Sequence, residues 1–206
     1  MKPKITFLSD AQLKAEADRC LYCEEKPCKT ACPADCSPAD FIMAVKAGAT
    51  SDFRRAAKLI MGSNAFGGVC GAVCPDWFCV KACSRRLFDH PIDIPAVQAT
   101  VVQKAKELGV LGGFKNAAAN GKTVAVVGAG PAGLGAAAVL AQLGYKVDVL
   151  EKNRKAGGAC RLIPDQRLHK EILRTEDFKE RFHSCRVAKK HKASTNRGLV
   201  EVCISG

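Results

Sequence analysis

Two cysteine-rich stretches decide how this chain folds. Residues 20–36 read CLYCEEKPCKTACPADC, and residues 70–83 read CGAVCPDWFCVKAC. Nine of the chain's 12 cysteines lie in these stretches, and each stretch contains a Cys-Pro pair. The first residues, MKPKITFLSDAQL, show no secretory signal, so the sequence predicts a cytoplasmic chain. In that compartment, clustered cysteines indicate metal binding rather than disulfides.

The spacing within the stretches favours iron–sulfur clusters over zinc. A cubane cluster needs four thiolates, which close cysteines in one loop and a distant cysteine can supply. Zinc sites usually combine two C-x2-4-C pairs, which the uneven spacing here does not match. We therefore predict two [4Fe–4S] clusters that share ligands, with the last cysteine of each stretch serving the other cluster. The framework consists of Cys20, Cys23, Cys28, Cys32, Cys74, Cys79 and Cys83.

The eighth ligand is open on spacing alone. Two four-iron clusters need eight ligands, and the framework supplies seven cysteines. Cys70 is the eighth by spacing. Cys36 is also in range, but it follows Pro33 too closely to bind a cluster comfortably from the same loop.

A glycine-rich loop in the second half predicts dinucleotide binding. Gly128-x-Gly130-x-x-Gly133 follows an apolar strand and opens a helix, and an acid ends the next strand. Such glycines permit a tight turn, approach of a pyrophosphate and close packing of helix on strand. A later glycine pair favours FAD over NAD. The predicted cofactor-binding residues are Gly128, Gly130, Pro131, Ala132, Gly133, Glu151, Gly157 and Gly158.

These patterns predict a mainly α iron–sulfur domain, α-helical ferredoxin-like, followed by a partial α/β Rossmann-type FAD-binding βαβ unit. Helical patterns cover residues 1–19 with Ser9 as N-cap, 38–62 with a break at Gly48, and 94–108 with Pro95 in the first turn. The predicted domains are 1–112 for the clusters, a linker 113–121, 122–175 for the Rossmann unit, and a basic tail 176–206 without definite structure.

Composition excludes several classes of function. The formal charge is +12, but aromatic residues make up only 6% and no nucleic-acid motif occurs, so we expect no nucleic-acid partner. Gly and Pro interrupt the most apolar stretch, which argues against a membrane span. The histidines are scattered and the carboxylates do not form pairs, so we predict no catalytic residue.

The ordered motifs resemble the glutamate synthase small-subunit family, to which the amino-terminal half of dihydropyrimidine dehydrogenase is similar. The two Cys-Pro pairs are followed by VGAGPAGL and then by Gly157-Gly158 ahead of Pro164 and Arg167-Leu168. The resemblance implies that an NADPH-derived hydride reaches FAD and that single electrons pass through the clusters to a partner oxidoreductase subunit.

The resemblance also implies a ligand assignment. One cluster would be held by Cys20, Cys23, Cys28 and Cys83. The other would be held by Cys32, Cys74, Cys79 and a non-cysteine ligand, for which Gln98 matches; Cys70 would then be a buried non-ligand.

The chain departs from the family after the IPDQRL segment. The second glycine-rich loop expected for NADPH is absent, and the basic tail matches nothing expected there. One hypothesis is a truncated or frame-shifted gene product, a cluster-binding fragment without a complete flavin site. The other is a short electron-transfer subunit whose FAD and NADPH sites another chain completes.

Overall fold

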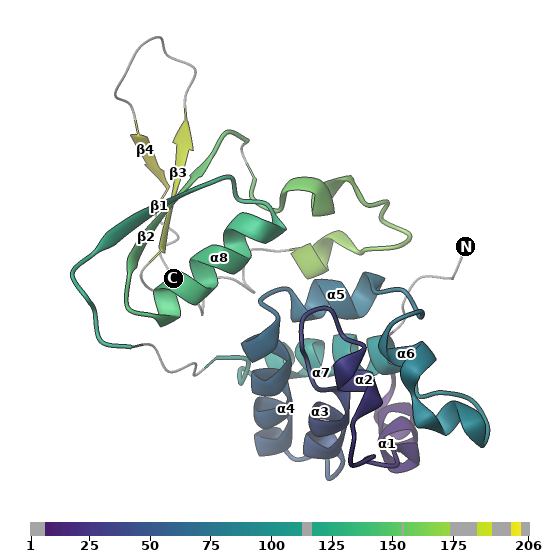
Figure 1. The fold of residues 1–206 in the computed structure, drawn as a ribbon. Helices are drawn as coiled ribbons and strands as arrows, with labels where there is room; N and C mark the ends of the chain where they lie inside the picture. Colours follow the sequence, from purple (N-terminus) through teal and green to yellow (C-terminus); the bar gives the residue numbers. More distant parts are fainter. Residues whose placement is uncertain (1–6, 113–116, 154, 174–184, 191–198, 203–206) are drawn as a thin grey trace. The chain divides into compact units, whose positions relative to one another are not determined.

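The chain folds into two compact units in the computed structural model (Figure 1). The structure describes residues 7–112, 117–153, 155–173, 185–190 and 199–202. The helical unit comprises residues 1–112 with 166–168, and the α/β unit comprises residues 113–165 with 169–206.

The helical unit alternates long helices with short helical turns. The long helices are α1 (Asp10–Arg19), α3 (Pro38–Val45), α4 (Thr50–Ser63) and α7 (Ile94–Glu107). Between them lie α2 (Pro27–Thr30), α5 (Gly67–Val73), α6 (Cys79–Ala82) and the 3-10 helix η1 (Ser84–Leu87). The cysteine-rich stretches therefore contain short helices as well as loops.

Helix ends follow the sequence signals. The Ser9 hydroxyl accepts a hydrogen bond from the Gln12 N–H (3.3 Å), while the Gln12 side chain accepts one from the Ser9 N–H (2.9 Å). This reciprocal arrangement is a capping box, and it starts α1 at the predicted position. Gly48, with φ +79°, separates α3 from α4, and Pro95 lies in the first turn of α7.

Helix α7 carries much of the helical core and contacts α3, α4 and α5. Its Val97 and Val101 are fully buried. Gly71 of α5 lies so close that a Cβ on it would stand 2.6 Å from the Ala99 nitrogen. Only glycine permits this approach, which sets the second half of α5 against the first half of α7.

The α/β unit begins with the predicted βαβ motif. Strand β1 (Thr123–Val127) pairs in parallel with β2 (Lys146–Glu151), and α8 (Pro131–Gln142) connects them. The buried side chains of α8 are Leu134, Ala137, Ala138 and Ala141. The 3-10 helices η2 (Gly158–Leu162) and η3 (Lys170–Leu173) follow β2.

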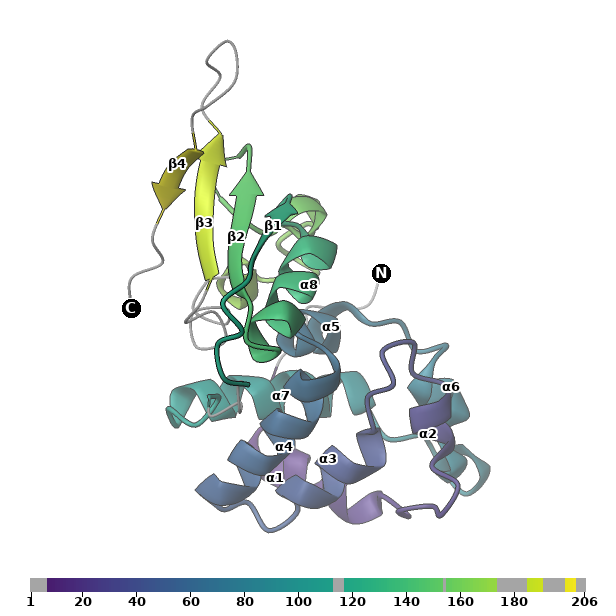
Figure 2. The ribbon, with the colours of Figure 1, turned by 60° about the vertical axis from the view of Figure 1, so that its left-hand side comes forward.

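Two further strands lie in the segment 176–206, for which the sequence predicts no definite structure. Strand β3 (Cys185–Lys190) pairs in parallel with β2, and β4 (Leu199–Val202) pairs antiparallel with β3 (Figure 2). The many basic residues of this segment obscure the period-two pattern of a strand. The rest of the segment lies outside the described residues.

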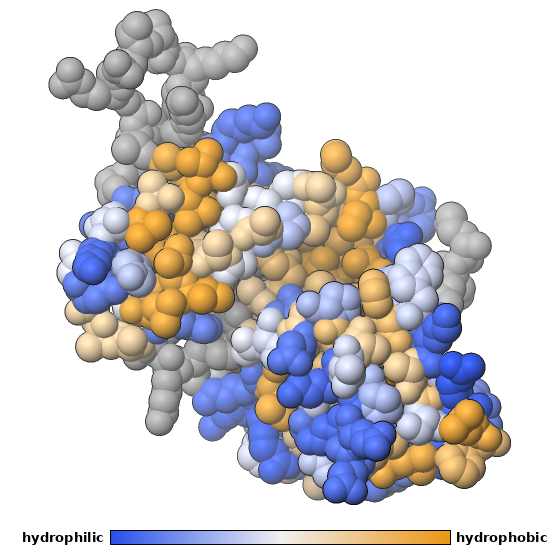
Figure 3. Space-filling model, viewed as in Figure 1, coloured by the Kyte–Doolittle hydropathy of each residue, from blue (hydrophilic) through white to orange (hydrophobic). Residues whose placement is uncertain are grey.

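The sheet order β1-β2-β3-β4 leaves β1 at one edge among the described strands. Val127 at the end of β1 is 84% exposed, and apolar surface is visible on the α/β unit in Figure 3. Parallel sheets are normally covered on both faces, so this surface is unusual for the fold. No helix among the described residues has both the length and the apolar character needed to cross a membrane.

Candidate functional site

Four cysteines from both cysteine-rich stretches line one cavity in the helical unit. The cavity is partly open to solvent. Its walls also include Leu21, Lys26, Ser84 and Arg85. We call the four cysteines the first thiol group; they are Cys20, Cys23, Cys28 and Cys83.

The first thiol group is partly shielded from water. Burial raises the pKa of Cys20 and of Cys28, and the neighbouring Cys83 raises both further. Backbone N–H groups partly offset this effect: that of Tyr22 is hydrogen-bonded to the Cys20 sulfur, and that of Ala39 to the Cys28 sulfur. Thiols gathered in this way ionise readily only when a cationic centre compensates their charge, as iron does.

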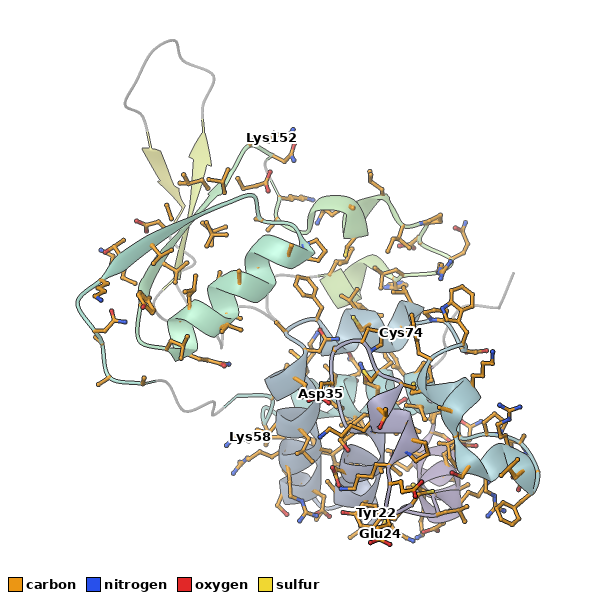
Figure 4. All side chains as sticks on the ribbon, viewed as in Figure 1. Tyr22, Glu24, Asp35, Lys58, Cys74 and Lys152 are labelled. Carbon is orange, nitrogen blue, oxygen red and sulfur yellow. The ribbon has the colours of Figure 1, made fainter. Side chains whose placement is uncertain are left out.

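The remaining cysteines of the two stretches form a second thiol group, which comprises Cys32, Cys36, Cys70, Cys74 and Cys79. The pKa of Cys36 is raised to about 12 and that of Cys79 to about 11, mainly by burial and in addition by the nearby Cys32. In Figure 4, Cys74 of this group and Tyr22, which directly precedes Cys23, lie on either side of α2. The nine cysteines of both groups are thiols without disulfides.

Two one-turn helices distribute cysteines between the groups. Helix α2 contains Cys28 of the first group, and Cys32 of the second follows it. Helix α6 begins at Cys79 of the second group, and Cys83 of the first follows it. The two helices contact each other. Because residues four apart lie about one helical turn apart, each helix reaches two adjacent sites.

The two candidates for an eighth ligand lie on neighbouring helices. Gln98 on α7 donates a hydrogen bond from Nε2 to the Gly67 carbonyl (2.7 Å). Cys70 on α5 is hydrogen-bonded to Cys74, one turn further on, and this bond lowers the pKa of Cys70. The geometry therefore brings Cys70 into the second thiol group, while the Gln98 amide contacts the start of α5.

The four thiols of the first group suit an iron–sulfur cluster by their donor chemistry. Among the described residues, no three Cys, His, Asp or Glu side chains are placed to hold one metal ion. In a [4Fe–4S] cluster each thiolate binds a different iron, so the ligands surround a larger body. Four thiols around an open cavity have this arrangement and the soft donor chemistry that iron–sulfur clusters require.

The segment 20–26, which we call the first ligand loop, contains two strained residues whose side chains are held by one carboxylate. Tyr22 (φ +47°) and Lys26 (φ +43°) adopt the left-handed conformation. Asp40 Oδ1, in the first turn of α3, accepts hydrogen bonds from Tyr22 Oη (3.0 Å) and Lys26 Nζ (2.7 Å). Burial opposes ionisation of Asp40, but these hydrogen bonds outweigh it and hold the pKa below its ordinary value. No sequence motif pointed to these three residues, because their contact is tertiary.

The glycine-rich loop of the α/β unit has the close packing that the sequence predicts. A Cβ on Gly133 would lie 1.9 Å from the Gly128 carbonyl oxygen. A Cβ on Gly158 would lie 2.8 Å from the Gly130 Cα, and the Gly157 N–H donates to the Ala129 carbonyl (2.7 Å). The later glycine pair therefore packs directly on the loop.

The predicted acid and the start of α8 lie at the same loop. Glu151 is 5% exposed and accepts hydrogen bonds from the N–H groups of Ala129 and Asn153, each 2.8 Å long. Burial opposes its ionisation, but these donors keep the pKa of Glu151 below its ordinary value. Pro131 and Ala132 form the exposed first turn of α8. A charged acid beside a helix N-terminus suits ribose and pyrophosphate groups.

Fold and sites together define a chain with an iron–sulfur type of thiol site in a helical unit and a dinucleotide-binding loop in an α/β unit. The chain belongs to the family of dihydropyrimidine dehydrogenase domain II, 4Fe-4S cluster, which matches residues 2–110. Residues 126–177 match the NAD(P)-binding Rossmann-like domain.

Similar proteins include larger oxidoreductase chains. The NAD-dependent dihydropyrimidine dehydrogenase subunit PreT of Escherichia coli K12 is 40% identical over 163 residues, which are 78% of this chain and 39% of that protein. The PreT homolog of Salmonella typhi is 39% identical over 163 residues, 78% of this chain and 38% of that protein. The glutamate synthase [NADPH] small chain of E. coli K12 is 34% identical over 167 residues, 80% and 35% respectively. The chain thus spans less than two fifths of the length of these relatives.

Replacing Asp40 tests whether it holds the first ligand loop. The left-handed conformations of Tyr22 and Lys26 cost about 1–3 kcal/mol each, and Asp40 offsets part of that cost. We expect Asp40→Ala to lose iron to a chelator several-fold faster than the unaltered chain, as followed by absorbance. Asp52→Ala, at the matching first turn of α4, is the control and should not change the rate. Equal rates in Asp40→Ala and the unaltered chain would contradict this role.

A pair of glycines in α8 tests the dinucleotide loop. Gly133→Ala forces a carbon against the Gly128 carbonyl, whereas Gly135 has nothing within 4 Å. Overpacking of this kind costs about 1–3 kcal/mol, so Gly133→Ala should weaken FAD binding about tenfold or more. Flavin fluorescence titration measures the affinity, and the thermal unfolding midpoint reports the same clash without ligand. Gly135→Ala should leave both unchanged; similar losses in the two variants would exclude the packing argument.

Proposed function

We propose that this chain is an electron-transfer module of an oxidoreductase, with two [4Fe–4S] clusters in the helical unit and FAD at the glycine-rich loop. The observation that carries the proposal is the cavity lined by four thiols from both cysteine-rich stretches. Membership in a 4Fe-4S domain family supports it. When bound, these groups supply the conversion of a hydride from NAD(P)H into single electrons.

For the clusters, we propose the ligand assignment that the family resemblance implies. Cys20, Cys23, Cys28 and Cys83 hold one cluster, and Cys32, Cys74, Cys79 and Gln98 hold the other. The hydrogen bond from Gln98 Nε2 to the Gly67 carbonyl favours this assignment, because it orients the amide and leaves Oε1 as the atom that can bind iron. Cys70 serves as the partner of Cys74 within α5.

For FAD, we propose that the glycine-rich backbone and one carboxylate of this chain form the binding site. The backbone of Gly128, Gly130 and Gly133 admits a pyrophosphate at the start of α8, and Glu151 accepts hydrogen bonds from ribose hydroxyls. Gly158 packs on Gly130 with no side chain between them, which holds the pair Gly157 and Gly158 against this loop. The absence of side chains at these glycines supports flavin binding at this end of the sheet.

We also propose that a partner oxidoreductase subunit exchanges electrons with this chain. Relatives are named as a subunit and as a small chain, which supports such an assembly. The exposed end of β1, with Val127 84% exposed, supports completion of the α/β unit by a further polypeptide segment. That segment would supply the NAD(P)H site that the glycine-rich loop, occupied by FAD, does not provide.

The direct test is iron, sulfide and flavin content after anaerobic reconstitution. The proposal predicts about eight iron and eight sulfide per chain, with flavin absorbance that bleaches on NAD(P)H addition once the partner is present. About eight iron per chain without flavin would support the two clusters and contradict FAD binding by this chain alone. The chain would then be an iron–sulfur binding fragment. Zinc without iron would overturn the proposal.

The eighth ligand is tested by a pair of variants. If Gln98 binds iron, Gln98→Ala should drop from about eight to about four iron per chain, while Cys70→Ser keeps about eight. Iron and sulfide analysis after identical reconstitution measures both. The opposite pattern would make Cys70 the ligand and Gln98 a packing residue at the α5–α7 contact.

A further inference from the structure

Ser84 stands within hydrogen-bond distance of a sulfur in the first thiol group. Its Oγ lies 3.3 Å from Cys23 Sγ, and the residue lines the same cavity as the four thiols. Ser84 comes directly after Cys83, so two consecutive residues supply the last thiol and the hydroxyl. Neither the cysteine spacing nor the glycine-rich loop predicts a role for Ser84.

The position of Ser84 is held by a network of charged groups. The neighbouring Arg85 donates from Nε and from its terminal nitrogen to the two carboxylate oxygens of Asp89, at 2.9 and 2.8 Å. Arg19, at the end of α1, donates to the same carboxylate (3.2 Å). Paired, planar contacts of this kind fix geometry as well as charge. The 3-10 helix that begins at Ser84 is therefore tied to α1.

The direction of the hydrogen bond follows from the state of the cysteine. A thiolate that binds iron carries no hydrogen, so the Ser84 hydroxyl must be the donor. Cys20 and Cys28 receive hydrogen bonds from backbone N–H groups, which no side-chain replacement removes. The hydrogen bond to Cys23 comes from a side chain and can be removed alone.

A donor to a ligand sulfur stabilises the more electron-rich state of a cluster more than the oxidised state. We propose that Ser84 is a positioning residue that acts through Cys23 to raise the reduction potential of the cluster held by Cys20, Cys23, Cys28 and Cys83. The inference rests on the proposed function. It adds a residue that sets how easily this one cluster accepts an electron.

The test is a potentiometric titration of the reconstituted full chain, followed by electron paramagnetic resonance. Ser84→Ala should shift the midpoint potential of one cluster to a more negative value and leave the other unchanged. Ser84→Thr keeps the hydroxyl and should retain the original potential, whereas Ser84→Val, of the same shape, should behave like the alanine variant. Ser63→Ala, an exposed serine of the same unit, is the control and should change neither potential.

The possible outcomes separate the inference from the proposed function. An unaltered chain that takes up no iron would overturn the proposed function itself. About eight iron with the same two potentials in the threonine and valine variants would overturn the role of Ser84 alone. Equal shifts of both clusters, or loss of a cluster from the valine variant only, would assign Ser84 a structural role and would also overturn it.

Discussion

The contact between the one-turn helices α2 and α6 is the constraint on which the helical unit depends. Each helix is followed by a cysteine that belongs to a different thiol group from the one it contains. Movement of either helix would therefore disturb both groups. The longer helices fix this pair from outside, since α3 contacts α2 and α7 contacts α6.

Both sites are built by bringing backbones unusually close. Gly71 allows α5 to pack closely on α7, and Gly133 allows α8 to pack closely on the turn after β1. In the first ligand loop the backbone turns tightly at Tyr22 and Lys26, which adopt the left-handed conformation. A single carboxylate holds both side chains. Strain of this kind persists only where surrounding contacts over-determine it, and it is common at sites that hold cofactors.

Much of this arrangement follows from local sequence signals. The capping box at Ser9, the break at Gly48 and the glycine-rich loop each depend on neighbours in the chain, and the family comparison supports the iron–sulfur and Rossmann-like assignments. Helix α5 has three glycines and low helix propensity, so its existence depends on packing against α7. Asp40 and Ser84 act across the fold, which sequence spacing does not encode. The basic residues of strand β3 obscure its period-two pattern.

The central claim is that the last cysteine of the second stretch completes the site of the first. The most direct measurement is the paramagnetic resonance spectrum of reduced, reconstituted chains that lack single cysteines. The account predicts that Cys83→Ala and Cys20→Ala lose the same cluster signal and keep the same remaining one, whereas Cys32→Ala and Cys79→Ala lose the other. If Cys83→Ala instead lost the signal that disappears in Cys79→Ala, the two stretches would each hold their own cluster, and the account would be contradicted.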